Sequence, residues 1–193
     1  MRLLFIGPPG AGKGTQAALV AARLGIPHVS TGEMFRHHVS RATDLGIRVK
    51  AILESGGYVP DDLTVAMLKE RIAAPDARPG FILDGFPRTA PQVEALDELI
   101  GVDGLDRVVL FEVDEDALVQ RMMGRGRADD TEETIRNRFK MYQEQTSPLI
   151  DIYKERDLVV SVDGLGNVDE VTERILRVVS DARVDNRHPA EST

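Results

Sequence analysis

One segment, Gly7-Pro-Pro-Gly-Ala-Gly-Lys-Gly-Thr15, governs the interpretation of the whole chain. It has the spacing G-x-x-x-x-G-K. The apolar run Arg2-Leu-Leu-Phe-Ile6 before it predicts a buried strand, and the alanine-rich run from Thr15 to Leu24 after it predicts a helix. Glycines let backbone N–H groups turn inward around an anion, while the helix N-terminus and Lys13 add positive charge. The segment therefore predicts a phosphate-binding loop.

The alternative for this segment is a glycine-rich turn with a solvated lysine, which the flanking strand and helix disfavour. One position departs from the general motif. Gly14 stands where serine or threonine is usual, and the hydroxyl comes one residue later, at Thr15. We therefore expect no direct metal ligand from the protein here, and a Mg²⁺ ion held mainly by phosphates and water.

Further β-type runs alternate with helical patterns along the chain. This alternation predicts an α/β fold of the P-loop NTPase type, with a parallel sheet of about five strands and helices on both faces. Ligands bind at the carboxyl ends of the strands in such sheets. The remaining strands are expected at His28-Val29, Phe81-Ile-Leu83, Arg107 to Val113 and Leu158 to Val162.

Two segments interrupt the alternation. One is a charged, helical insertion at about 30–59, and the other is the glycine and arginine cluster Gly124-Arg-Gly-Arg-Ala-Asp-Asp130. Residues 1–180 are expected to form one core domain that carries both. Residues 181–193 have few apolar side chains and include His188-Pro189, so we expect a disordered tail there.

Composition excludes several classes of protein. The 193 residues are 42% hydrophobic, which suits one folded domain. A net charge of −8 argues against a nucleic-acid or anionic-membrane binder. The absence of cysteine excludes disulfides and a cysteine zinc site, and we expect no zinc. The run from Leu3 to Ile6 is too short for a signal peptide or a membrane span, so a cytoplasmic protein is expected.

Two charged residues follow the strand at Phe81. Asp84 can orient the water molecules of a magnesium ion on the loop phosphates, although a turn or helix-capping role is the alternative. Arg88 can reach a phosphate with its planar fork, although a lone arginine after a turn is more often solvated. Lys13 at a neighbouring strand end favours the functional interpretation of both.

Five motifs occur in a familiar order: the phosphate loop, Ser30-Thr-Gly-Glu-Met-Phe-Arg36, Gly57-Tyr-Val-Pro-Asp61, Asp84-Gly-Phe-Pro-Arg-Thr89 and Arg127-Ala-Asp-Asp130. In this order the chain resembles adenylate kinases from about Met1 to Val179. The resemblance implies reversible, Mg²⁺-dependent transfer of a phosphoryl group from ATP to AMP, which yields two ADP. It also implies an AMP-binding arm in the 30–59 insertion and a lid at about 124–130.

The resemblance further implies roles for individual residues. Gly10, Ala11, Gly12, Lys13, Gly14 and Thr15 would bind the ATP phosphates. Arg36 and Arg88 would hold the AMP phosphate, and Gln92 would contact the adenine edge. The adenine and ribose pocket would be lined by Thr31 and by the backbone of Gly57, Tyr58 and Val59. The wall between the two nucleotides would consist of Gly85, Phe86, Pro87 and Arg88. Without the resemblance, Thr31 would be a helix cap or first residue and Gln92 a solvated side chain.

Five arginines lie within eighteen positions of an acidic chain, at 121, 125, 127, 136 and 138, and this concentration suggests an anion as ligand. Taken singly, each would more often be solvated. The resemblance places Arg121 at the ATP adenine and Arg125 at the ATP phosphates. It places Arg127 and Arg138 at the transferred phosphoryl group and AMP, and it gives Arg136 no role. Asp129 and Asp130 would pair with arginines or cap the next helix. Gly166 would contact the ATP adenine, and a plain strand-to-helix turn is an equal alternative.

The lid departs from the resemblance, since Gly126 alone separates Arg125 and Arg127. The nearest alternative function is a UMP/CMP-type kinase, in which the position of Thr31 is usually alanine. A guanine-nucleotide switch is disfavoured because the chain has no Asn-Lys-x-Asp motif. A nonenzymatic nucleotide-binding module stays open. Phosphoryl transfer needs no protein nucleophile, and we expect a monomer whose partners are ATP, AMP and ADP.

Overall fold

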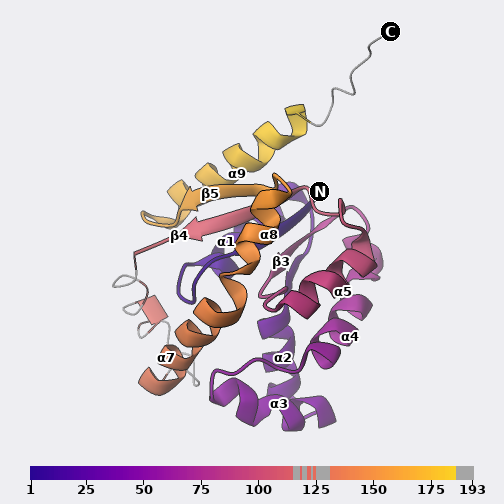
Figure 1. Ribbon diagram of the computed structural model, residues 1–193, viewed down its shortest axis with the longest axis vertical. Helices are drawn as coiled ribbons and strands as arrows, with labels where there is room; N and C mark the ends of the chain where they lie inside the picture. Colours follow the sequence, from indigo (N-terminus) through magenta and orange to yellow (C-terminus); the bar gives the residue numbers. More distant parts are fainter. Residues whose placement is uncertain (115–117, 119–120, 123, 125–130, 186–193) are drawn as a thin grey trace.

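The computed structural model describes residues 1–114, 118, 121, 122, 124 and 131–185. Its centre is a parallel sheet (Figure 1). The sheet has five strands in the order β2-β3-β1-β4-β5. This sheet confirms the predicted fold class. The strands are β1 (Arg2–Ile6), β2 (His28–Ser30), β3 (Phe81–Asp84), β4 (Arg107–Glu112) and β5 (Val159–Asp163).

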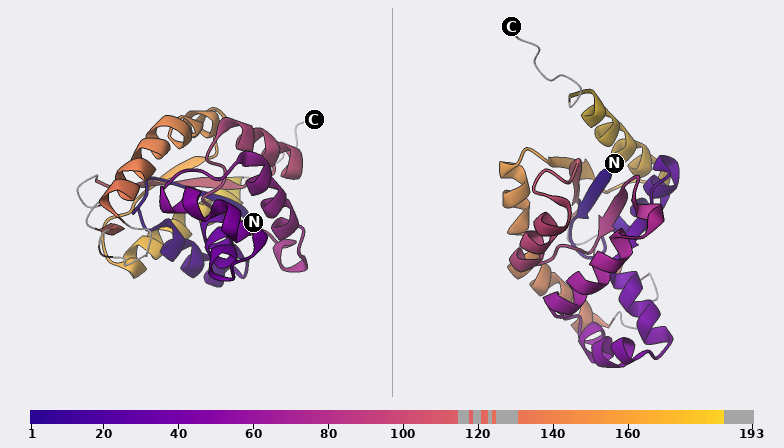
Figure 2. Two further views of the ribbon diagram at one scale, coloured as in Figure 1. Left: turned by 90° about the horizontal axis from the view of Figure 1, so that it is seen from below. Right: turned by 90° about the vertical axis from the view of Figure 1, so that its right-hand side faces the viewer.

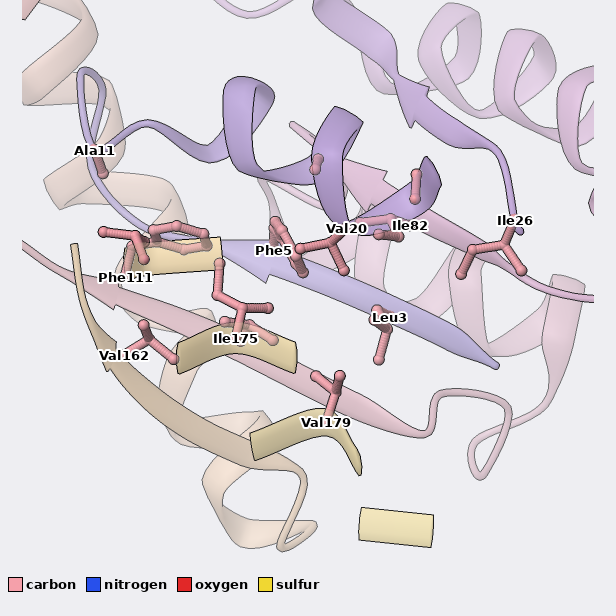
Figure 3. Packing of buried hydrophobic residues seen from close by; sticks show 14 of the residues in the cluster. Leu3, Phe5, Ala11, Val20, Ile26, Ile82, Phe111, Val162, Ile175 and Val179 are labelled. Carbon is pink, nitrogen blue, oxygen red and sulfur yellow. The ribbon is translucent and has the colours of Figure 1, made fainter. Parts of the chain in front are cut away.

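Helices cover both faces of the sheet. Successive side chains of a strand point to opposite faces, so the apolar strands can pack against helices on both sides. In β1, Leu3 and Phe5 pack with α1 and α9, whereas Leu4 and Ile6 pack toward α4, α5 and α8. Figure 3 shows the first of these clusters, with Ile175 of α9 close to the strands. The covering helices are α1 (Lys13–Leu24), α4 (Asp61–Ile72), α5 (Ala90–Ile100), α8 (Leu149–Glu155) and α9 (Val168–Asp185).

The 30–59 insertion forms a helical arm of α2 (Thr31–Ser40) and α3 (Asp44–Glu54). The arm lies beyond one end of the sheet (Figure 2). Its small apolar core is shared with α4, since Met67 packs there with Phe35 and Val49. A helix from the other side of the molecule, α7 (Glu132–Met141), contacts it, because Thr134 Oγ1 donates a 2.7 Å hydrogen bond to the carbonyl of Glu54. The remaining short elements are a 3₁₀ turn, η1 (Pro75–Ala77), and a π-helical turn, η2 (Tyr142–Thr146).

Two boundaries differ from the sequence predictions, at the start of α1 and at the end of α9. Helix α1 begins at Lys13 rather than Thr15, because Gly12 in a left-handed conformation already serves as its N-cap. The described cap of α7 is Thr131, whose hydroxyl accepts from the N–H of Thr134. Helix α9 continues to Asp185, inside the expected tail, since that stretch has no proline before Pro189. Residues 186–193 lie outside the described residues.

Candidate active site

A cavity of about 560 Å³ opens where the carboxyl ends of β1 and β3 meet the arm. The two strands are adjacent, and their register pairs Phe5 with Asp84, so the segments that follow them must lie side by side. The volume is that of a typical small-molecule site. Its walls include fourteen of the predicted residues: Gly10, Gly12, Lys13, Gly14, Thr15, Arg36, Gly57, Tyr58, Asp84, Gly85, Pro87, Arg88, Arg121 and Arg138.

The phosphate loop forms one side of the cavity. Gly10 and Gly12 have φ values of 84° and 90°, which glycine adopts without steric cost. Because the cap residue Gly12 has no side chain, the N–H groups of the first turn of α1 remain available to an anion. Lys13 Nζ donates to the carbonyls of Gly7 and Pro8, at 2.7 and 2.9 Å. The loop thus gathers positive charge at the sheet edge.

Asp84 lies at the end of β3, beside the loop. Its Oδ2 is 3.3 Å from His28 Nε2, on the neighbouring strand β2. Burial alone would raise the pKa of the Asp84 carboxyl, but the hydrogen bond with His28 and the charges of Lys13 and Arg88 outweigh burial and lower this pKa. Asp84 is therefore ionised at neutral pH.

Arg88 is held by its own loop. The φ of Gly85 is 80°, and a Cβ there would lie 2.8 Å from Arg88 Nη2, so only glycine leaves room for the guanidinium. Arg88 Nε donates to the Gly85 carbonyl at 2.7 Å. Thr31, the first residue of α2 after the N-cap Ser30, also donates to this carbonyl, at 2.8 Å. Wall and arm therefore meet at one backbone carbonyl.

Gln92 does not face the cavity and is not solvated. The residue is 2% exposed. Both the oxygen and the nitrogen of its side-chain amide form hydrogen bonds within the protein. Nε2 donates to Asp61 at 2.6 Å, and Oε1 accepts from the backbone N–H of Arg88 at 2.8 Å. Asp61 also accepts from the hydroxyl of Thr89, at 3.0 Å. Sequence reasoning gave Asp61 no role, although its position after Pro60 in a recognised motif was an available signal.

The arginines form the opposite side of the cavity. Arg121 donates through both terminal nitrogens to the carbonyl of Gly164, at 3.2 Å each, next to the loop that contains Gly166. Arg138 comes from α7 and lies against Gly56. Arg136 instead pairs with Glu132 on the exposed surface. Ala11, Thr31, Val59, Phe86, Gln92 and Gly166 are not among the lining residues.

Arg125, Arg127, Asp129 and Asp130 lie outside the described residues. The lining residues that were not predicted include Tyr142 and Thr146. Both belong to the π-helical turn η2, whose i to i+5 spacing gives no regular sequence pattern. Burial, and then the neighbouring Tyr58, raise the pKa of Tyr142 to about 12, so its hydroxyl stays protonated at neutral pH.

Comparison with known proteins agrees with this geometry. The family model described as adenylate kinase matches residues 5–158, which include the loop, the arm, Asp84, Arg88 and Arg138. The chain belongs to the adenylate kinase family. Its similarity to other members extends beyond the matched range. It is 54% identical to the adenylate kinase of Nocardioides sp. over 93% of this chain and 97% of that protein. The adenylate kinase of Rhodococcus erythropolis is 52% identical over 91% and 97% of the two chains. That of Nocardia farcinica is 51% identical over 93% and 99%.

Membership of this family explains the separate charged groups around one cavity, because adenylate kinases transfer a phosphoryl group between two anionic nucleotides. Among the described helices, none is long and apolar enough to cross a membrane. The described residues also contain no group of three histidines or carboxylates that could hold a metal ion.

Proposed function

We propose that this cavity binds ATP and AMP together and aligns them for direct phosphoryl transfer, which gives two ADP. The observation that carries the proposal is that one cavity has the phosphate loop on one side and Arg36, Arg88 and Arg138 on the others. Such a transfer requires positioning and charge neutralisation more than covalent chemistry.

The donor nucleotide is assigned to the loop side. Backbone N–H groups of residues 10–15 and the ammonium of Lys13 would bind the ATP phosphates. Arg121 would cover the adenine, since its guanidinium is anchored on the Gly164 carbonyl beside the Gly166 turn. Arg125 is proposed to reach the ATP phosphates from the lid.

The acceptor nucleotide is assigned to the arm side. Arg36 and Arg88 would hold the AMP phosphate, because a planar guanidinium binds two phosphate oxygens at once. Arg138 and Arg127 would stabilise the charge on the transferred group. The backbone at Gly57 to Val59 would contact the adenosine, and the hydrogen bonds of Gln92 to Asp61 and Arg88 support a role in shaping that pocket.

Adenylate kinases use Mg²⁺ with ATP, and the residues around the loop fit this use. Asp84 is ionised and lines the cavity beside the loop, whereas Gly14 offers no hydroxyl. Phosphate oxygens and water would therefore be the main ligands of the ion, and Asp84 would orient its water molecules. Bound Mg²⁺ supplies charge neutralisation at the β- and γ-phosphates.

The test is an ADP-formation assay with ATP and each of AMP, CMP, UMP and GMP. We expect AMP to be preferred at least about tenfold in kcat/KM, because a wrong base leaves buried polar groups unpaired. Equal use of CMP or UMP would favour the UMP/CMP-type alternative. Binding of nucleotides without ADP formation would favour a nonenzymatic module.

We further propose a monomer that acts in the cytoplasm. The arm, loop and wall that line the cavity all come from one chain, which supports a complete site in each monomer. Light scattering on the purified protein checks the mass, and cell fractionation checks the location. A dimer mass, or recovery with the membrane fraction, would contradict the proposal.

A further inference from the structure

Tyr58, Thr146 and Arg88 come from three separate parts of the chain and meet at the cavity. Tyr58 lies in the arm after α3, Arg88 follows β3, and Thr146 ends the π-helical turn η2. The Tyr58 hydroxyl lies 2.9 Å from Thr146 Oγ1, and Thr146 Oγ1 lies 2.9 Å from the carbonyl oxygen of Arg88. A carbonyl can only accept, so Thr146 donates its single proton to Arg88. Tyr58 must then donate to Thr146, which fixes the direction of both hydrogen bonds.

The aromatic ring of Tyr58 contacts the guanidinium of Arg88. The guanidinium carbon of Arg88 lies 5.0 Å from the ring centroid, within the range of a cation–π interaction. Among the described residues, the Arg88 side chain has one hydrogen-bond partner, the Gly85 carbonyl, to which Nε donates. The terminal nitrogens form no hydrogen bond with any residue that the structure describes, and Arg88 lines the cavity. One tyrosine thus orients an arginine whose free donors remain for a ligand.

We propose that Tyr58 is a positioning residue for Arg88: its ring orients the guanidinium toward the AMP phosphate, and its hydroxyl fixes the Arg88 backbone through Thr146. This inference rests on the proposed binding of AMP and goes beyond the backbone contact expected of Tyr58. Since Tyr58 lies in the last part of the 30–59 arm, displacement of the arm separates the ring from the guanidinium. The phosphate-binding geometry of Arg88 therefore depends on where the arm lies.

The experiment compares Tyr58→Leu, which loses ring and hydroxyl, with Tyr58→Phe, which loses only the hydroxyl. Calorimetric AMP affinity and steady-state kinetics are measured for both, with circular dichroism and melting temperature as folding checks. We expect Tyr58→Leu to lower kcat/KM for AMP about tenfold or more, and Tyr58→Phe by about threefold. KM for ATP should change less than about twofold, since these contacts lie on the AMP side.

Further variants separate positioning from general damage. Thr146→Val should lower kcat/KM for AMP about as much as Tyr58→Phe does. Thr146→Ser keeps the hydroxyl, so its kcat/KM for AMP should stay close to that of the parent protein. Tyr153→Phe is the matched control, since among the described residues its buried hydroxyl has no hydrogen-bond partner. In an Arg88→Lys background, which lacks the planar fork, Tyr58→Leu should have less than about a threefold further effect.

The outcomes are distinguishable. Unchanged AMP kinetics in Tyr58→Leu, equal losses for ATP and AMP, or full additivity with Arg88→Lys would overturn the inference while leaving the proposed function intact. If Tyr58→Leu alone fails to fold, the result for Tyr58→Phe with Thr146→Val and Thr146→Ser decides the matter. If the unmodified protein makes no ADP from ATP and AMP, the proposed function itself fails.

Discussion

His28 Nε2 lies 3.3 Å from Asp84 Oδ2, which joins the last residue of β3 to its neighbour β2 at the edge of the cavity. The side chains are only 11% and 14% exposed, so solvent screens the interaction weakly. This contact and the charge of Lys13 lower the pKa of Asp84 in spite of burial. The carboxylate that would orient Mg²⁺-bound water therefore also contributes to folding.

A pH-dependent contribution to stability follows. Because the pKa of Asp84 is lower in the folded state than its ordinary value of 3.8, ionised Asp84 stabilises the fold above that value. This stability is lost as the pH falls through the folded-state pKa. The unfolding free energy of the parent protein, measured in urea, should thus fall more steeply than that of Asp84→Asn from about pH 5 to pH 3. Parallel curves for the two proteins would contradict the prediction.

Lys13→Met should strongly lower the rate of phosphoryl transfer while leaving the fold intact. The substitution removes the charge proposed to bind the β- and γ-phosphates, so we expect kcat to fall by about 10²-fold or more. Steady-state ADP formation and far-ultraviolet circular dichroism are the measurements. The control is Lys154→Met, which removes an exposed lysine paired with Asp151 on α8. A Lys13→Met protein with near-parental kcat would refute the role.

Arg127→Lys tests the short lid. Lysine keeps the charge but loses the planar fork, so kcat should fall by about 10²-fold or more while AMP affinity changes much less. Arg136→Lys is the control, because Arg136 is exposed and pairs with Glu132. If kcat is unchanged in Arg127→Lys, the transfer role belongs to Arg88, Arg125 and Arg138.

A second consequence expected of the proposed short lid is slow ATP hydrolysis. With only Gly126 between Arg125 and Arg127, little protein remains to keep water from the γ-phosphate. Phosphate release from ATP without AMP should therefore be detectable above a Lys13→Met background. Equal rates in the two proteins would show that water is excluded well.

Away from the cavity, Arg156 should contribute to stability through its pair with Asp97. Two hydrogen bonds of 2.9 and 2.8 Å join α8 to α5, and the Arg156 guanidinium also lies over the Tyr153 ring. Arg156→Met leaves Asp97 half-buried and unpaired, and should cost about 1–2 kcal/mol of unfolding free energy in urea. Arg136→Met, at a pair that is 78% and 74% exposed, should cost less than about 0.5 kcal/mol. Equal losses would show that both pairs are equally screened by solvent.

Several features followed from local sequence. The glycine spacing around Lys13 and the strand before it predicted the phosphate loop, because backbone conformation and helix onset depend on residues close in the chain. The apolar runs predicted the strands, and their alternation with helices predicted a parallel sheet. Such sheets bind ligands at their carboxyl edge, so Asp84 and Arg88 were found as well.

Other features depended on tertiary structure. Gln92 turned inward to Asp61, and Tyr58, Thr146 and Arg88 met across three separate segments. Neither arrangement has a local signature. Both arrangements depend on which strands are neighbours, on where α4 packs and on the irregular turn η2. A side-chain contact between distant segments forms only once those elements are placed. The sequence by itself therefore determined the loop, the sheet and the charges, while packing decided which side chains orient those charges.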